Sequence, residues 1–164
     1  MQIRSDVAGG SGGQYISVEE GIDSPDAPTD GIATYTFTVA GGTYEIDCRV
    51  IVYSGSDDAY FVTIPGAAVN RAVHDSGWVY WNGVEVGEDW HWDIVHSRTD
   101  DDLEVEWTLE AGTHTLQIAY RNGGPLLDAR KMVRSVVIFD LLLKRKLHIK
   151  CGSKMNPPAV PGGK

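Results

Sequence analysis

The chain has 164 residues and carries 14 Lys and Arg against 23 Asp and Glu, so its formal net charge at pH 7 is -9. A chain of this length forms one domain with its own core, and its negative field disfavours nucleic acid as a partner. No apolar stretch approaches the ~20 residues needed to span a bilayer. The 19 Gly beside 5 Trp and 7 Tyr favour an all-β protein over a helical enzyme core.

The first 14 residues end in a glycine-rich run and predict an arm or linker. From residue 15 onward the hydrophobic period is two, which indicates strands. We expect a short first strand over Tyr15–Glu19, a loop containing Pro25 and Pro28, and a second strand over Ile32–Val39.

The clearest alternation follows a predicted turn at residues 40–43. There the apolar side chains share one face of the expected strand and charged side chains share the other, so one face should be wet. The apolar positions are Tyr44, Ile46, Cys48, Val50 and Val52, and the charged ones are Glu45, Asp47 and Arg49.

Further strands are expected at Ala59–Ile64 and Val79–Trp81, and on both sides of a predicted turn at Ala111-Gly112. A last core strand is expected over Val133–Phe139. Short strands at this spacing with glycine turns are typical of a sandwich or barrel. The sequence thus predicts a β-sandwich over residues 15–140, followed by a basic extension and a Pro/Gly tail over residues 141–164.

The two cysteines, Cys48 and Cys151, are too few for a disulfide framework. They can pair in an oxidising compartment, or Cys48 can serve as a small buried apolar residue. No signal-peptide pattern occurs at the start of the chain.

Catalytic motifs are absent from the sequence: it has no HExxH, CxxC, GxSxG or P-loop pattern. His91 and His96 are five residues apart, so on a regular strand they would point to opposite faces. His114 falls on an alternating core face, as a structural histidine does. We therefore expect a protein that is not an enzyme.

Aromatic residues gather in one stretch of the chain, between residues 78 and 92. Ring faces stack on the C–H patches of sugars, and the hydroxyls of sugars need amide and carboxylate partners. The stretch is also rich in Gly, Asp and Glu, which predicts exposed loops. The candidate platform residues are Trp78, Tyr80, Trp81, Trp90 and Trp92. As an alternative, several of these rings fill the core, together with Trp107.

Several segments occur in the order seen in carbohydrate-binding modules of the family 6 and family 35 type, which the chain resembles. The match covers roughly residues 14–139. The segments are Tyr15–Gly21, Gly42–Ile46 with Arg49-Val50, Ser56–Val62, Trp90–Asp93, Leu109–Leu116 and Tyr120–Asp128.

This resemblance implies a jelly-roll β-sandwich of two antiparallel sheets that binds glycans without cleaving them. It also implies a structural Ca²⁺ held by Glu19 and Asp128, although this chain has Ser17 where the family commonly has an acidic residue. The sugar cleft would take aromatic rings from residues 78–92 and polar groups from Arg121 and Asn122. The negative charge of the chain favours neutral sugars.

A second interpretation uses the same fold as a structural subunit of a surface assembly, such as a virion decoration or an extracellular filament. The N-terminal arm or the strand-like segment 141–150 would then pair with the sheet edge of a neighbouring copy, giving a homo-oligomer. Both interpretations place the protein outside the cell or on a particle surface.

Overall fold

The computed structural model describes residues 1–134, apart from residues 28 and 30, and nearly all regular structure in that part of the chain is β. The expected all-β fold is therefore confirmed. The strands are β1 (Gln2–Arg4), β2 (Tyr15–Ser17), β3 (Ala33–Val52), β4 (Ala59–Thr63), β5 (Ala68–Val69), β6 (Val79–Asn82), β7 (Gly87–Ile94), β8 (His96–Ser97), β9 (Leu103–Glu104), β10 (Glu106–Tyr120) and β11 (Leu126–Arg134), with 3-10 turns η1 (Ser11–Gly13) and η2 (Arg98–Asp100).

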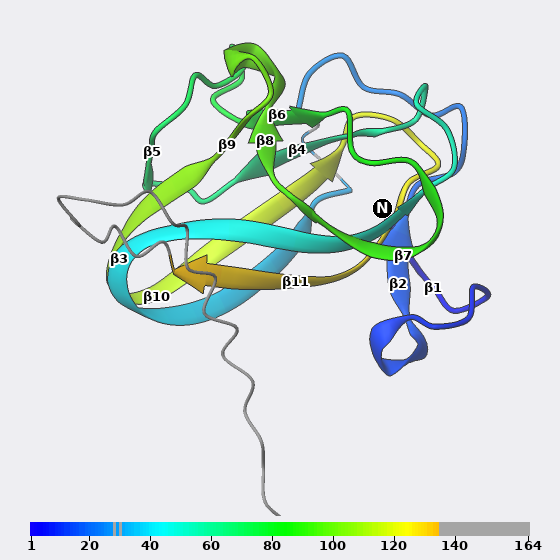
Figure 1. Ribbon diagram of the computed structural model, residues 1–164, viewed down its shortest axis with the longest axis horizontal. Coiled ribbons are helices and arrows are strands. Elements are labelled where there is room, and N and C mark those ends of the chain that lie inside the picture. The colour runs from blue at the N-terminus through cyan, green and yellow to red at the C-terminus, as the bar shows by residue number, and fades with distance from the viewer. Residues whose placement is uncertain (28, 30, 135–164) are drawn as a thin grey trace, which may run out of the picture.

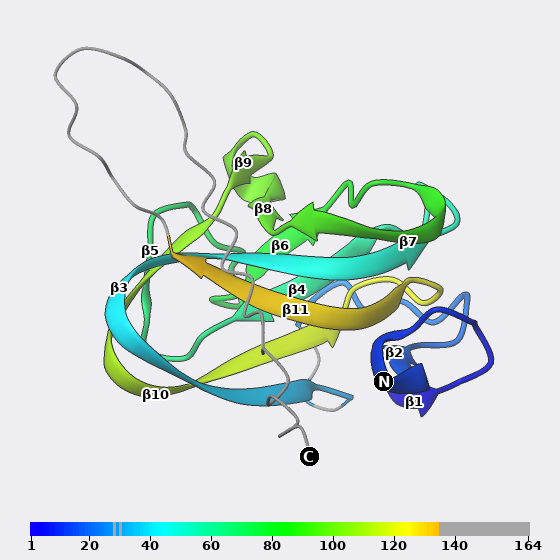
Figure 2. The ribbon, with the colours of Figure 1, turned by 60° about the horizontal axis from the view of Figure 1, so that its bottom comes forward.

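Two layers of the sandwich share one long strand, β3. Its first part pairs antiparallel with β10, from Ala33 to Glu45, and its second part pairs with β11 on one edge and β7 on the other. Among the described residues, nine strands form a single hydrogen-bonded sheet, and β8 and β9 form a small second one. Figure 2 shows β3 and β10 curling together at the left, where the lower layer continues into the upper one.

Glycines permit this curl, and here two sequence expectations were wrong. Residues 40–43 and 111–112 do not end strands, because β3 and β10 run through them and pair across the bend, with Ala111 opposite Ala40. Gly41 has a φ of 83° and Gly112 a φ of 144°. Glycine adopts these backbone angles without a steric penalty, so both strands bend at the same level and stay paired.

The main core lies between the layers and contains the residues that alternation selected on β3. Ile46, Cys48, Val50 and Val52 are fully buried, and Tyr44 is nearly so. Facing them are the buried residues of the other strands, among them Tyr60, Val62, Trp81, Trp107, Leu116 and Ile118. The opposite face of β3 is less exposed to solvent than expected, because Ile51 on that face is also buried.

The N-terminal segment folds back onto its own chain. β1 pairs antiparallel with β2, with Ile3 opposite Ile16, and β2 pairs in turn with β11. In Figure 1 this segment, drawn in dark blue, lies at one end of the sandwich, beside the end of β7. We call residues 1–14 the N-terminal arm.

The last described strand, β11, begins at Leu126, earlier than the strand expected over Val133–Phe139, most of which lies outside the described residues. The expected extension over residues 141–164 and Cys151 also lie outside them. No helix in the described part of the chain is long and apolar enough to cross a bilayer.

Candidate functional site

A cleft of about 420 Å³ opens between the N-terminal arm and the end of the sandwich. Three parts of the chain that are distant in sequence form its walls: the arm with β2, the β3–β4 loop and the start of β11. Its lining residues are Arg4, Asp6 and Val7 from the arm, Tyr15 and Ser17 from β2, Val18, Glu19 and Glu20 after β2, Tyr53, Ser54 and Asp57 between β3 and β4, and Gly124 and Leu126 at the start of β11.

A small apolar cluster supports this cleft from below. It consists of the buried residues Tyr15, Ile51 and Leu126, against which Val7 and Trp90 pack. The rings of Tyr15 and Trp90 meet edge to face with centroids 5.8 Å apart. Trp90 also donates from Nε1 to the carbonyl oxygen of Ala8 at 3.0 Å, which fixes the arm over the cluster.

Ser17 lines the cleft, and its side-chain hydroxyl has no hydrogen-bond partner in the described structure. The residue is 3% exposed, and its Oγ is fully buried. Tyr15 and Ser17 point to the same side of β2 because they are two residues apart, while Ile16 packs against the main core. Buried polar groups are nearly always hydrogen-bonded, so an unpartnered one beside a cleft needs an explanation.

Asp6 and Tyr15 form the second polar element of the cleft. Tyr15 Oη donates to Asp6 Oδ1 at 2.7 Å. Burial, followed by this hydrogen bond to a carboxylate, raises the pKa of Tyr15 to about 12, and the same hydrogen bond lowers the pKa of Asp6. At neutral pH the pair is therefore a phenol donating to a carboxylate.

Tyr53 supplies an exposed ring at the rim. It follows the last residue of β3 and is 56% exposed, whereas Ile51, two residues earlier on the same face, is covered by the arm. A large exposed ring next to a polar cleft is the arrangement in which sugars stack.

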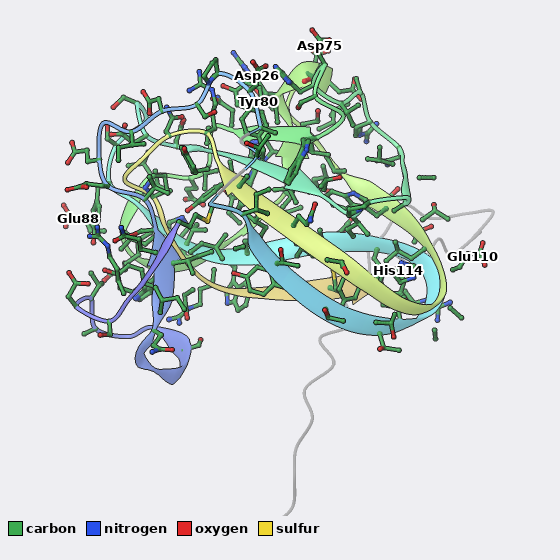
Figure 3. The ribbon with its side chains drawn as sticks, turned by 180° about the vertical axis from the view of Figure 1, so that it is seen from behind. Asp26, Asp75, Tyr80, Glu88, Glu110 and His114 are labelled. Atoms are coloured by element: carbon green, nitrogen blue, oxygen red, sulfur yellow. The ribbon has the colours of Figure 1, made fainter. Side chains whose placement is uncertain are left out.

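The aromatic residues selected from the sequence do not form one platform. Trp81 is fully buried in the core, where it stacks on Tyr60, and Trp107 is buried as expected. Tyr80 packs against Phe61 and donates to Asn82 Oδ1 at 2.7 Å. In Figure 3, Tyr80 lies well apart from Glu88, which marks the β7 end of the molecule.

The remaining tryptophans differ in exposure. Trp78, just before β6, and Trp90 on β7 are half-buried. Trp92 on β7 is 44% exposed and is the most exposed ring of the selected set. None of these three lines the cleft.

Arg121 and Asn122 lie in the loop between β10 and β11, as the resemblance implies, but they do not line the cleft. Asn122 donates from Nδ2 to Asp23 Oδ1 at 3.1 Å, and the backbone N–H groups of both residues donate to the carbonyl of Ala59. They tie loops together, and Gly124 of the same loop reaches the cleft wall.

The two proposed calcium ligands have different surroundings. The carboxylate of Asp128 is fully buried, with Oδ2 2.6 Å from Arg49 Nη1 and Oδ1 accepting from the Ser11 N–H at 2.7 Å. Glu19 lines the cleft instead. The described residues contain no group of three or more His, Cys, Asp or Glu side chains placed to hold a metal. Because a guanidinium already neutralises Asp128, this donor set does not fit Ca²⁺.

Both histidines of β7 and β8 bridge backbone carbonyls. The ring nitrogens of His91 lie 2.9 Å from the carbonyl oxygens of Asp89 and Glu85, and those of His96 lie 3.1 and 2.7 Å from the carbonyl oxygens of Ile94 and Asn82. His114, near the strand curl in Figure 3, contacts the carbonyl of Glu110. These contacts secure loops, as expected for structural histidines.

Sequence reasoning missed the residues that form the cleft from the arm and from the β3–β4 loop. The only signal was weak: the alternation on β3 continues to residue 53, which predicts Tyr53 on the face opposite the core. Arg4 and Asp6 carry no local signal, since their role depends on the arm folding back across β2.

No protein-family model matches the chain, and no curated protein is significantly similar to it.

Proposed function

We propose that this protein binds carbohydrate non-covalently, and that the cleft between the N-terminal arm and β2 is the binding site. The observation that carries the proposal is the combination of the exposed Tyr53 ring with the unpartnered buried hydroxyl of Ser17 on one cleft. A sugar supplies both complements, because it has C–H patches for the ring and hydroxyls for Ser17.

The shape of the site supports a small part of a glycan chain. A volume of about 420 Å³ lies within the range of small-molecule clefts and accommodates one or two sugar units. One stacking ring and a few hydrogen bonds offset only part of the cost of immobilising a ligand, so we expect micromolar or weaker affinity.

The test is titration of soluble polysaccharides and oligosaccharides, followed by calorimetry, with and without calcium. Tyr53→Ala should weaken binding about tenfold through loss of the stacking contact. Trp92→Ala, which removes an exposed ring outside the cleft, is the matched control and should bind as the parent protein does.

Loss of binding in Trp92→Ala alone would move the site to β7 and overturn the assignment to the cleft. Absence of binding to every neutral, basic and acidic glycan, from a folded protein, would overturn the carbohydrate-binding function.

A further inference from the structure

The lining of the cleft carries an excess of negative charge. Asp6, Glu19, Glu20 and Asp57 contribute carboxylates, and Arg4 is the one basic side chain among the lining residues. No ion pair joins any of these five side chains to another residue of the described structure. The cleft lining therefore has four carboxylates against one basic side chain, in a chain whose net charge is already -9.

This negative charge affects anionic, neutral and cationic sugars differently. A uronic acid or a sulfated sugar would bring an anion beside several unpaired carboxylates, which is a repulsive contact. A neutral sugar would gain hydrogen bonds of ordinary strength. A sugar with a protonated amine would gain charge-assisted hydrogen bonds, which are about twice as strong as neutral ones.

We propose that the cleft selects a glycan with a free, protonated amino group, such as a chain of glucosamine units. This inference rests on the proposed carbohydrate-binding function and names the sugar class. Tyr53 stacks on the sugar ring, the Ser17 hydroxyl pairs with a sugar hydroxyl, and the carboxylates accept from the ammonium group.

The contacts already made by these side chains leave room for such a ligand. Within the described residues, Asp6 accepts from Tyr15 through Oδ1, and its own backbone N–H and the charge of Arg4 also stabilise the carboxylate. Among the hydrogen bonds of the described part of the chain, Asp57 Oδ2 accepts only from the neighbouring Ser56 hydroxyl, at 3.2 Å, which leaves this carboxylate open to an ammonium donor. An ammonium group has three N–H donors and can engage more than one of these oxygens at once.

The test compares two tetrasaccharides with the same β-1,4 backbone, one of glucosamine and one of N-acetylglucosamine, by calorimetry on the full chain. Acetylation removes the charge and keeps the ring. We expect the free-amine oligomer to bind about tenfold tighter at low salt, with an advantage that shrinks as salt is added.

Variants separate a local effect from the overall charge. The double variant Glu20→Gln with Asp57→Asn should remove most of the preference for the amine, so that the two oligomers bind with similar affinity. The double variant Glu110→Gln with Asp75→Asn removes two negative charges outside the cleft lining (Figure 3); it is the matched charge control and should keep the preference. Tyr53→Ala should weaken both oligomers.

Each outcome decides between the two proposals. Equal or tighter binding of the acetylated oligomer would overturn the selection of amines and leave carbohydrate binding standing. A preference that falls as much in this charge control as in Glu20→Gln with Asp57→Asn would also overturn it, because the effect would then come from net charge. Failure of both oligomers and of every other glycan would overturn carbohydrate binding itself.

Discussion

Arg49 on β3 donates to the buried carboxylate of Asp128 on β11 at 2.6 Å, and each partner also holds the N-terminal arm. Arg49 Nη1 donates to the Gly9 carbonyl at 2.9 Å, and Asp128 accepts from the Ser11 N–H. The Arg49 guanidinium also lies 5.4 Å from the centroid of Trp90. The cleft therefore depends on this ion pair, because the arm forms one of its walls.

The first prediction concerns that ion pair. Arg49→Met should lower the free energy of unfolding by about 3 kcal/mol, because it leaves the buried Asp128 carboxylate without its cation. Arg98→Met, which breaks the exposed pair with Asp102, should cost no more than about 0.5 kcal/mol. Urea unfolding of both variants measures the difference, and equal costs would contradict the structural role of the Arg49–Asp128 pair.

A second prediction concerns the bend of the sandwich. Gly41 and Gly66 have nearly equal φ angles of 83° and 81°, but a Cβ on Gly41 would lie 3.0 Å from the backbone nitrogen of Ala111, whereas one on Gly66 would meet nothing within 4 Å. Gly66→Ala should therefore cost about 1 kcal/mol from backbone strain alone. Gly41→Ala should cost about 3 kcal/mol, because the clash opens the pairing of β3 and β10.

Thermal unfolding of Gly41→Ala and Gly66→Ala provides the measurement. If the two variants lose the same stability, the close approach of the strands at the bend is not a constraint on the fold.

A third prediction follows from the raised pKa of Tyr15, about 12 against an ordinary value of 10.0. Folding favours the protonated phenol, so this stabilisation is complete below pH 10 and is lost as the pH rises through about 12. Tyr15→Phe cannot ionise, so its stability should fall less over that range than the stability of the parent protein. Urea midpoints measured across the range test this, and parallel curves would show that Tyr15 does not contribute.

A fourth prediction compares two buried serines. The Ser97 hydroxyl donates to the Ala72 carbonyl at 2.7 Å, whereas the Ser17 hydroxyl has no partner in the described residues. Ser97→Ala should lose about 1 kcal/mol of stability, and Ser17→Ala should gain about 1 kcal/mol, because it removes an unsatisfied buried group. Calorimetric unfolding measures both changes.

The same Ser17→Ala variant should bind glycan more weakly than the parent protein, since the hydroxyl is then missing from the site. A variant that is both more stable and unaltered in binding would remove Ser17 from the proposed site.

The alternation of apolar and polar residues correctly predicted which face of a strand packs against the main core. The buried face of β3 from Tyr44 to Val52 is the clearest case. The same reasoning failed at Gly41 and Gly112, because a glycine in a strand either ends it or bends it, and the choice depends on whether the partner strand bends at the same level. Here both strands bend at the same level, since Ala40, next to Gly41, lies opposite Ala111, next to Gly112.

The cleft was less accessible to sequence reasoning than the core. The density of tryptophans predicts a binding platform within residues 78–92, but Trp81 lies in the main core and Trp90 packs against the small apolar cluster beside the arm. Which side a ring faces depends on pairing partners that are far away in sequence. The hydrogen bond from Ser11 to Asp128 spans 117 residues, and no local pattern reveals it.

The shared strand β3 also bears on the order in which the protein folds. Ile46 and Val50 lie on β3, but the strands that pair with this part of it are supplied by residues 87–94 and 126–134. Chain closure over such distances is slow. During synthesis this part of β3 lacks its partner β11 until residue 126 and beyond have been made, so the nascent chain carries an incomplete core over that interval and is exposed to aggregation.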